Sequence, residues 1–153
     1  MHREAIAAGL VAVLTAGLLC ALPSSAQDAN SAPTIELNAG IHLIHAEVAN
    51  DDRTRMRGLM FRDSLPPNHG MIFFFPEDDV HCMWMRNTLI PLSVAFMAAD
   101  GTVVNVEDMK PQTDDKHCAA KPVHLALEMS YEWFQKRGVA PGFKIQGLPS
   151  PKR

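Results

Sequence analysis

The strongest local structural signal in the chain is the dipeptide Asp100-Gly101. It lies between two runs rich in β-branched and aromatic residues, at residues 93–97 and 102–106. An Asp-Gly pair between such runs is typical of a tight hairpin, because glycine accepts the positive φ that the turn requires. The dipeptide therefore predicts an antiparallel two-stranded hairpin in the middle of the chain.

Further short β-rich runs lie on both sides of this hairpin. They are residues 34–37, 41–48, 71–75, 123–129 and 143–145. The run 71–75 is continuously apolar, which favours a strand buried on both faces, and Pro76 is expected to end it. Run 123–129 alternates apolar and polar residues, which predicts a strand with one buried face.

Two short helices complete the expected elements. Asn50 or Asp51 is a suitable cap for the first, whose apolar face would carry Met56, Leu59 and Met60. Ser130 would begin the second, near residues 131–137, and Gly138 would end it. Many short strands with two brief helices predict a mainly β fold with short helices (β-rich α+β), forming a compact antiparallel sandwich or a barrel-like domain.

The first 26 residues differ in composition from the rest. Arg3 precedes an uncharged apolar run at residues 5–22, and small residues, Ser24 and Ala26, follow it. This is the layout of a secretory signal peptide cleaved near Ala26; an uncleaved membrane anchor is the alternative. We expect a periplasmic or secreted protein with a disordered leader at 27–33, one β-rich domain at 34–147 and a tail at 148–153, without a stable membrane span after cleavage.

Removal of the signal peptide leaves two cysteines, Cys82 and Cys118. An even number of cysteines in an oxidising compartment favours a disulfide. Each cysteine follows a histidine, His81 or His117, and thiolate, thioether and imidazole groups together select copper(I). A soft-metal site at His81, Cys82, His117 and Cys118 is therefore the less favoured alternative, and no metal or other cofactor is assigned.

Charge and motifs exclude several functions. The formal net charge is −3, which does not indicate a nucleic-acid partner. The sequence contains no Gly-x-Ser-x-Gly elbow, phosphate loop, dinucleotide fingerprint or His-Glu-x-x-His motif. No catalytic residue is assigned.

Several sequence blocks resemble the bacterial and archaeal family called domain of unknown function 192. These are residues 55–62, 70–76 and 83–92, together with Asp100-Gly101 and Leu127-Glu128, and they lie in a segment of about residues 35–147. The resemblance implies a compact β-rich domain, usually exported, without a settled activity. This chain departs from the family pattern at three positions: Ser93 replaces a common Asp, Glu132 replaces a frequent Gly, and Phe143 follows Gly142 where Gly-Asp is usual.

Six residues form the candidate ligand-binding set: Arg55, Arg62, Trp84, Asn87, Thr88 and Glu128. Trp84 offers a stacking face, Asn87 offers donors and acceptors, and the arginines offer a fork for carboxylate or phosphate. We expect Arg62 and Asn87 to belong to one site. The alternative, which the local sequence favours, is that Trp84 fills the core while Asn87 and Thr88 cap backbone groups before Pro91.

A buried Glu128–Arg ion pair is expected in preference to a catalytic acid, because no second carboxylate in these blocks matches Glu128. The sequence therefore predicts an exported cell-envelope protein that acts as a non-catalytic binding or accessory module with a small polar cleft. Its partner would be a small molecule or an envelope component. An enzyme acting on an envelope saccharide or peptide is the first alternative, and soft-metal binding is the second.

Overall fold

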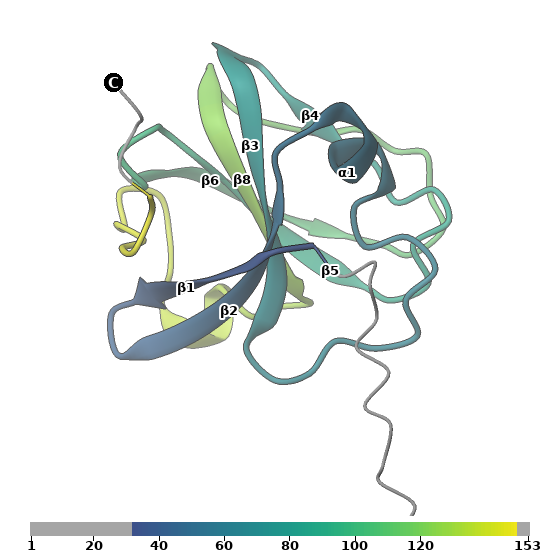
Figure 1. Ribbon diagram of the computed structural model, residues 1–153, viewed down its shortest axis with the longest axis horizontal. Coiled ribbons are helices and arrows are strands. Elements are labelled where there is room, and N and C mark those ends of the chain that lie inside the picture. Colours follow the sequence, from purple (N-terminus) through teal and green to yellow (C-terminus); the bar gives the residue numbers. More distant parts are fainter. Residues whose placement is uncertain (1–31, 150–153) are drawn as a thin grey trace, which may run out of the picture.

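The computed structural model describes residues 32–149, and a six-stranded sheet is its main element (Figure 1). The strand order is β1-β2-β3-β8-β5-β6. The bounds are β1 Thr34–Ala39, β2 His42–Ala49, β3 His69–Asp79, β5 Leu92–Met97, β6 Val103–Met109 and β8 Val123–Ser130. A separate two-stranded ribbon pairs β4 (Cys82–Met83) with β7 (His117–Cys118). The structure confirms the mainly β class for residues 32–149. The expected signal peptide lies outside the described residues.

The sheet is mixed, whereas the sequence predicted an antiparallel one. Strands β2 and β3 are parallel, and the other pairs of the sheet are antiparallel. Parallel neighbours need a crossover connection, and the chain supplies it through helix α1 (Asp52–Arg57) and the loop before β3. Helix α1 is therefore part of the crossover that allows β2 and β3 to pair in parallel.

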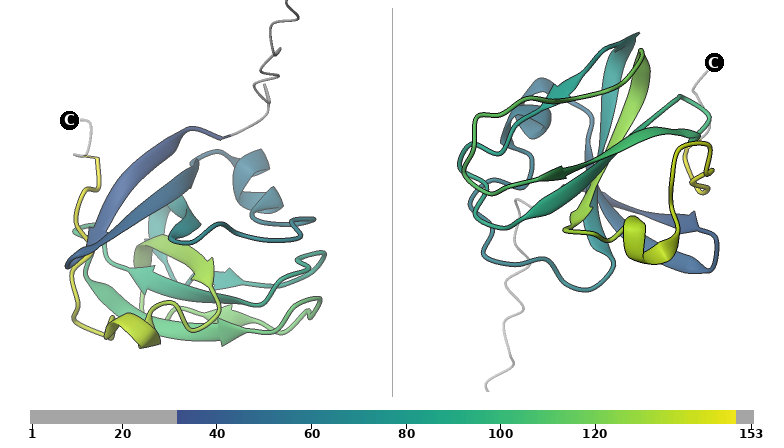
Figure 2. Two further views of the ribbon diagram at one scale, coloured as in Figure 1. Left: turned by 90° about the horizontal axis from the view of Figure 1, so that it is seen from below. Right: turned by 180° about the vertical axis from the view of Figure 1, so that it is seen from behind.

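The sheet does not close into a barrel within residues 32–149, but the C-terminal segment connects its two ends (Figure 2). Backbone hydrogen bonds of 2.9 Å join Gln146 to Asn38 of β1 in both directions. The amide of Ile145 donates to the carbonyl of Gly101, at the turn before β6, over 3.0 Å. The expected strand 143–145 thus forms single bridges instead of a strand of its own.

Both faces of the central strands are buried. Leu125, Leu127 and Met129 of β8 belong to one hydrophobic cluster, while Ala126 belongs to a second cluster on the other face. The alternating pattern of β8 therefore does not mark a polar, solvated face. Glu128 lies on the same face as Ala126 and is only 4% exposed.

The expected hairpin is confirmed. β5 and β6 pair antiparallel around Gly101, which has φ +86°. A Cβ at Gly101 would lie 2.3 Å from the carbonyl oxygen of Ile145. Glycine is therefore required there for two reasons, the positive φ and the close backbone.

Strand β3 is longer than predicted, because Pro76 does not end it. The strand continues to Asp79, with a register irregularity against β8 between Phe74 and Asp79. A proline is tolerated at such an irregularity because its missing N–H interrupts no regular ladder. The apolar part of the strand is buried as expected at Met71, Ile72 and Phe73.

Helix α1 begins after Asp51, whose side chain accepts a hydrogen bond from the amide of Thr54 over 2.8 Å. The predicted apolar face is partly wrong, since Met56 is 72% exposed and only Leu59 is fully buried. The second expected helix is reduced to turns and a short 3₁₀ helix, Gln135–Arg137, which ends at the left-handed Gly138. Both helices are too short to determine the fold.

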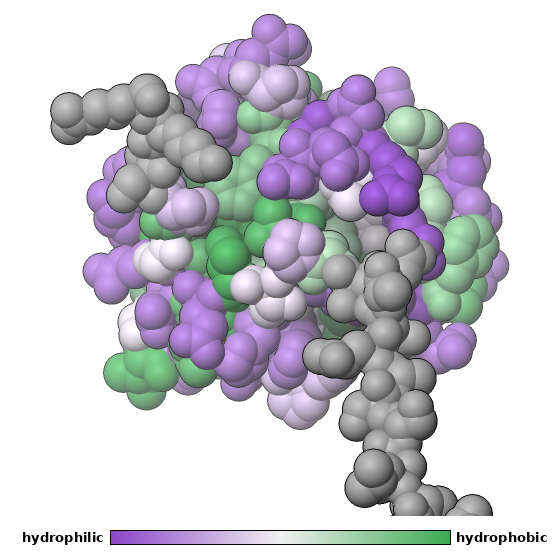
Figure 3. Space-filling view, viewed as in Figure 1, coloured by the Kyte–Doolittle hydropathy of each residue, from purple (hydrophilic) through white to green (hydrophobic). Residues whose placement is uncertain are grey.

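The face seen in Figure 3 is mostly hydrophilic at its periphery, with apolar residues near its centre and in a few places at its edge. Within residues 32–149, no helix is long and apolar enough to cross a membrane.

Candidate ligand-binding site

A pocket of about 380 Å³ lies beside α1, and segments far apart in the sequence line it. We name it the Glu128 pocket. Its walls include residues from four of the five blocks that carry the family resemblance, all except Asp100-Gly101: Arg55, Phe73, Trp84, Thr88 and Glu128. The structure thus brings four of the six candidate ligand-binding residues to one cavity.

Glu128 is the chemically unusual group of this pocket. Its side chain makes no hydrogen bond and no ion pair within 4.0 Å among residues 32–149. Burial raises its pKa from 4.5 to about 8, because the low-dielectric surroundings disfavour the charged carboxylate. At neutral pH Glu128 is therefore mostly a neutral carboxylic acid, which can donate one hydrogen bond and accept others.

The expected Glu128–Arg ion pair is wrong, although Arg55 lines the same pocket. Nη1 of Arg55 donates to the carbonyl oxygen of Phe74 over 2.9 Å, and Nη2 donates to Oδ1 of Asp52 over 2.6 Å. These two bonds hold the guanidinium at the pocket wall, with the side chain 18% exposed. The pocket thus has a fixed cation and a buried neutral acid that do not neutralise each other.

Trp84 lies at the surface and not in the core. Its exposed fraction is 45%, whereas the next residue, Met85, is completely buried. Cζ of Arg86 lies 4.3 Å from the centroid of the Trp84 ring, and Nε of Arg86 donates to Oδ1 of Asp114 over 2.8 Å. The prediction that Trp84 fills the core is therefore wrong; the residue lines the Glu128 pocket, and Arg86 lies over its ring.

Thr88 and Asn87 take different positions. Thr88 is 5% exposed and lines the Glu128 pocket, with its backbone N–H bonded to the carbonyl of Met85 over 3.0 Å. Asn87 is exposed, adopts φ +58°, and accepts a bond of 2.9 Å from the amide of Phe61 at its backbone oxygen. Asparagine tolerates this left-handed conformation better than most residues, so its observed role is in the backbone turn.

Arg62 lines a second cavity of about 380 Å³, the Arg62 pocket, together with Glu47. Nη2 of Arg62 donates to Oε2 of Glu47 over 2.6 Å. The side chains are 35% and 20% exposed, respectively. Arg62 thus lines a different pocket from Trp84 and Glu128, and its ion pair joins it to β2. The expectation that Arg62 and Asn87 belong to one site stays a prediction.

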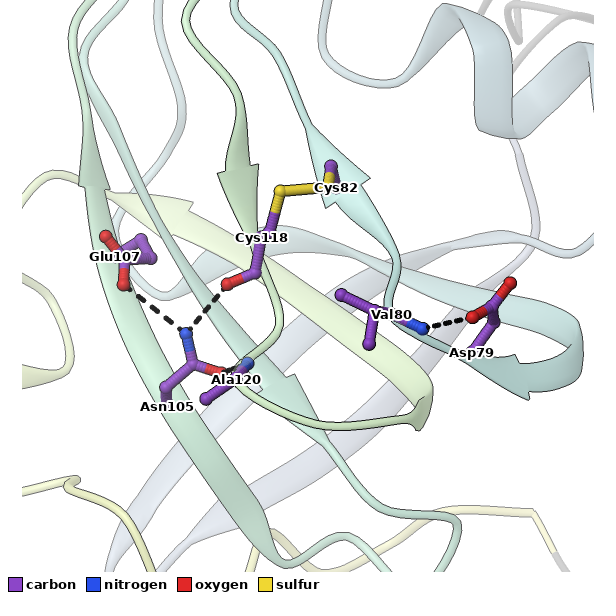
Figure 4. The surroundings of a disulfide bond; sticks show 7 residues. All are labelled: Asp79, Val80, Cys82, Asn105, Glu107, Cys118 and Ala120. Carbon is purple, nitrogen blue, oxygen red and sulfur yellow. Dashed lines mark hydrogen bonds between the residues drawn. A yellow bond between two sulfur atoms is a disulfide. The ribbon is translucent and has the colours of Figure 1, made fainter.

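A disulfide joins Cys82 and Cys118 and holds β4 to β7 (Figure 4). The Cα atoms are 4.0 Å apart, closer than the 5–6 Å expected from general geometry, because the two residues are direct partners across the ribbon. Nδ2 of Asn105 donates to the carbonyl of Cys118 over 3.1 Å, and Oδ1 of Asn105 accepts from the amide of Ala120 over 2.9 Å (Figure 4). Asn105 therefore links this ribbon to β6.

The disulfide argues against the soft-metal alternative, because both sulfur atoms are bonded to each other and neither is a thiolate. His81 stacks on Phe75 with ring centroids 3.7 Å apart, and its Nε2 lies 3.0 Å from the carbonyl oxygen of Glu77. His81 thus has a structural role next to the Glu128 pocket. No group of three or more His, Cys, Asp or Glu side chains in residues 32–149 is arranged to hold a metal ion.

Sequence reasoning missed the apolar walls of the Glu128 pocket, which are formed by Leu59, Phe73, Phe75 and Met83. The signal was present, since each lies in one of the blocks that resemble the family. The structure also explains why glycine is frequent in the family at the position of Glu132. The backbone there has φ +59°, a conformation that glycine adopts without strain.

The fold and pocket define a small, strand-rich domain with a disulfide-linked ribbon and a buried acid, Glu128, that has no hydrogen-bond or ion-pair partner within residues 32–149. The chain belongs to the DUF192 family (Uncharacterized ACR), whose model matches residues 34–147. No curated protein matches the chain.

Two solved structures are similar to this chain over most of its length. One is a protein from Sinorhizobium meliloti 1021 described as a "putative transcription regulator"; it is 33% identical, covers 76% of this chain and 95% of its own, and gives a TM-score of 0.72. The other is a protein of unknown function from Novosphingobium aromaticivorans DSM 12444, 32% identical, covering 74% of this chain and 83% of its own, with a TM-score of 0.69. Both similarities support the fold and the family, and the function of the family is not established.

Proposed function

We propose that the protein is a non-catalytic binding module that takes a small ligand in the Glu128 pocket. The observation that carries the proposal is Glu128 itself, a carboxyl group 4% exposed that lines a cavity and has no polar partner in residues 32–149. A buried polar group without a partner destabilises a fold by about 1–3 kcal/mol. A bound ligand that supplies the missing hydrogen bond gives a reason for keeping such a group.

The pocket lining indicates the chemistry of the ligand. Arg55 supplies positive charge, and neutral Glu128 supplies a donor, so the ligand carries hydrogen-bond acceptors. Phe73 and the exposed ring of Trp84 supply apolar and stacking surface. A small compound with a ring and acceptor groups, such as a saccharide or a peptide fragment of the envelope, fits these properties.

An enzyme that uses Glu128 as a general acid is the second candidate, because a pKa near 8 keeps this acid protonated at neutral pH. Glycoside hydrolysis needs a second carboxylate. The other carboxylate of the pocket lining, Asp52, is 94% exposed and accepts a hydrogen bond from Arg55. This arrangement favours binding over hydrolysis.

A role in transcription regulation, the description given to the S. meliloti protein, has little support here. The net charge of −3 provides no electrostatic attraction for phosphates. We therefore do not extend that description to this chain.

Export to the periplasm or beyond is part of the proposal. The apolar run at residues 5–22, the small residues before Gln27 and the Cys82–Cys118 disulfide support it. N-terminal sequencing of protein from a cell-envelope fraction is expected to begin at Gln27. Recovery of an intact segment 1–26 in the membrane would show an anchored protein instead.

A fragment screen by ligand-observed NMR, including monosaccharides and short peptides, tests the binding function. Hits are expected to bind the wild type and a Glu77→Gln control, because Glu77 is exposed and does not line the pocket. Glu128→Leu should abolish the same hits. Equal binding by Glu128→Leu would overturn the proposal, and turnover of a bound compound that stops in Glu128→Gln would assign the enzyme.

A further inference from the structure

Three polar side chains form a row across neighbouring strands, away from the Glu128 pocket. Glu36 of β1 is the direct partner of His45 in β2, and His45 is the direct partner of His69 in β3. Direct partners in adjacent strands point to the same face of a sheet. The row therefore places two imidazoles and one carboxylate side by side.

The two imidazole rings have the separation that a shared metal ion requires. Their centroids are 5.0 Å apart, with 32° between the ring planes. A Zn–N bond of about 2.0–2.1 Å plus an imidazole radius of about 1.1 Å puts two rings on one tetrahedral ion about 5 Å apart, centroid to centroid. The observed centroid separation of His45 and His69 matches this value.

A backbone oxygen orients the ring of His69 through Nδ1, which lies 3.0 Å from the carbonyl oxygen of Pro67. A carbonyl oxygen only accepts, so Nδ1 of His69 carries the proton and the lone pair is on Nε2. Nδ1 of His45 lies 3.8 Å from Oε1 of Glu36, which is an ion-pair distance and not a hydrogen bond. Metal-binding histidines in proteins are oriented by such carbonyl and carboxylate partners.

We propose that His45 and His69 form a surface site for a divalent transition-metal ion that prefers imidazole, with Nε2 of each ring as ligand. The carboxylate of Glu36, 3.8 Å from Nδ1 of His45, adds negative charge beside the site. Water fills the remaining coordination positions, which is consistent with side chains that are partly exposed, 37% for His45. The order of affinities for nitrogen ligands gives tighter binding of Cu²⁺ than of Zn²⁺.

The test is isothermal titration of the tag-free full chain with Zn²⁺ alone. We expect His45→Gln and His69→Gln each to weaken binding by about tenfold or more, since each removes one of two protein ligands. His124→Gln is the matched control, because His124 is another partly exposed histidine, with Nδ1 3.2 Å from Oδ1 of Asp78, and is not part of the row. Saturating Zn²⁺ should raise the melting temperature of the wild type and of the control only.

A second measurement on the wild type keeps the proposal testable even if a variant fails to fold. Substoichiometric Cu²⁺ should broaden the imidazole NMR signals of His45 and His69 before those of His124 and His117. Zn²⁺ affinity unchanged in both His45→Gln and His69→Gln, or broadening that starts elsewhere, would overturn the site. Neither result depends on the Glu128 pocket, so this inference fails or stands independently of the proposed function.

Discussion

The two pockets that the α1 connection lines have the same volume, about 380 Å³ each, and differ in the state of their carboxylates. In the Arg62 pocket, Glu47 is partly exposed and paired with an arginine at 2.6 Å. In the Glu128 pocket, the acid is buried, and the arginine that lines the same cavity bonds to a backbone carbonyl and to Asp52. The difference shows that an arginine in the same pocket does not neutralise an acid unless its guanidinium is free to reach it.

The two carboxylates also differ in how they affect the stability of the fold. A paired, partly exposed carboxylate such as Glu47 changes the free energy of unfolding little in either direction. An unpaired buried acid such as Glu128 lowers stability, and its retention needs another reason. Four predictions follow from this contrast.

The largest expected effect is a pH dependence of stability caused by Glu128. Its folded-state pKa of about 8 lies above the unfolded value of 4.5, so the folded state holds a proton that the unfolded state loses between these pH values. The free energy of unfolding should therefore fall as pH rises from about 4.5 to 8, by up to about 5 kcal/mol, and then level off. Urea denaturation across this pH range measures it.

Glu128→Gln should remove most of that slope, whereas Glu47→Gln should leave it in place. A wild-type stability that is flat between pH 5 and 8 would show that Glu128 is solvated or paired in solution. The contrast between the two pockets would then be lost.

The disulfide should give the next largest effect. Cys82 and Cys118 are 36 residues apart in sequence, and a loop of this length stabilises a fold by up to about 4 kcal/mol in the chain-entropy model. The Cys82→Ser/Cys118→Ser variant should lower the urea midpoint, and reducing agent should have no further effect on it. Cys82 lines the Glu128 pocket and not the Arg62 pocket. The double variant should therefore change the NMR chemical shifts of Trp84 more than those of Arg62.

Removal of the buried acid should stabilise the protein. Glu128→Leu replaces an unpaired carboxyl by an apolar side chain of similar size, and we expect a gain of about 1–3 kcal/mol at pH 7. The gain should accompany the loss of ligand binding described above. A destabilised Glu128→Leu variant would indicate that the carboxyl makes favourable interactions within the fold.

The smallest effect is expected in the Arg62 pocket. Arg62→Ala should lower the free energy of unfolding by less than about 1 kcal/mol, because the pair with Glu47 is partly solvated. The same denaturation assay, repeated at high salt, should reduce even this difference. A loss of several kcal/mol would show that the Arg62–Glu47 pair contributes strongly to stability, and it would weaken the contrast with Glu128.

The sequence by itself determined the features whose energies are local. Asp100-Gly101 specifies its hairpin because the turn needs a positive φ, and Asp51 caps α1 through a bond to a residue three positions away. The Cys82–Cys118 bond followed from there being two cysteines in the expected mature chain. The stacking face of Trp84 and the polar groups of Arg55, Thr88 and Glu128 predict a ligand-binding role, and all four line one pocket.

Only the tertiary structure decided how these pieces meet. The parallel pairing of β2 with β3 and the burial of both faces of β8 depend on contacts between distant segments, which periodicity within one strand does not report. For the same reason, the sequence placed Arg62 with Glu128, whereas the fold pairs Arg62 with Glu47. Whether a charged group is paired depends on which side chain reaches it in the folded protein. In the Glu128 pocket, Arg55 bonds to Phe74 and Asp52, so Glu128 has no ion-pair partner.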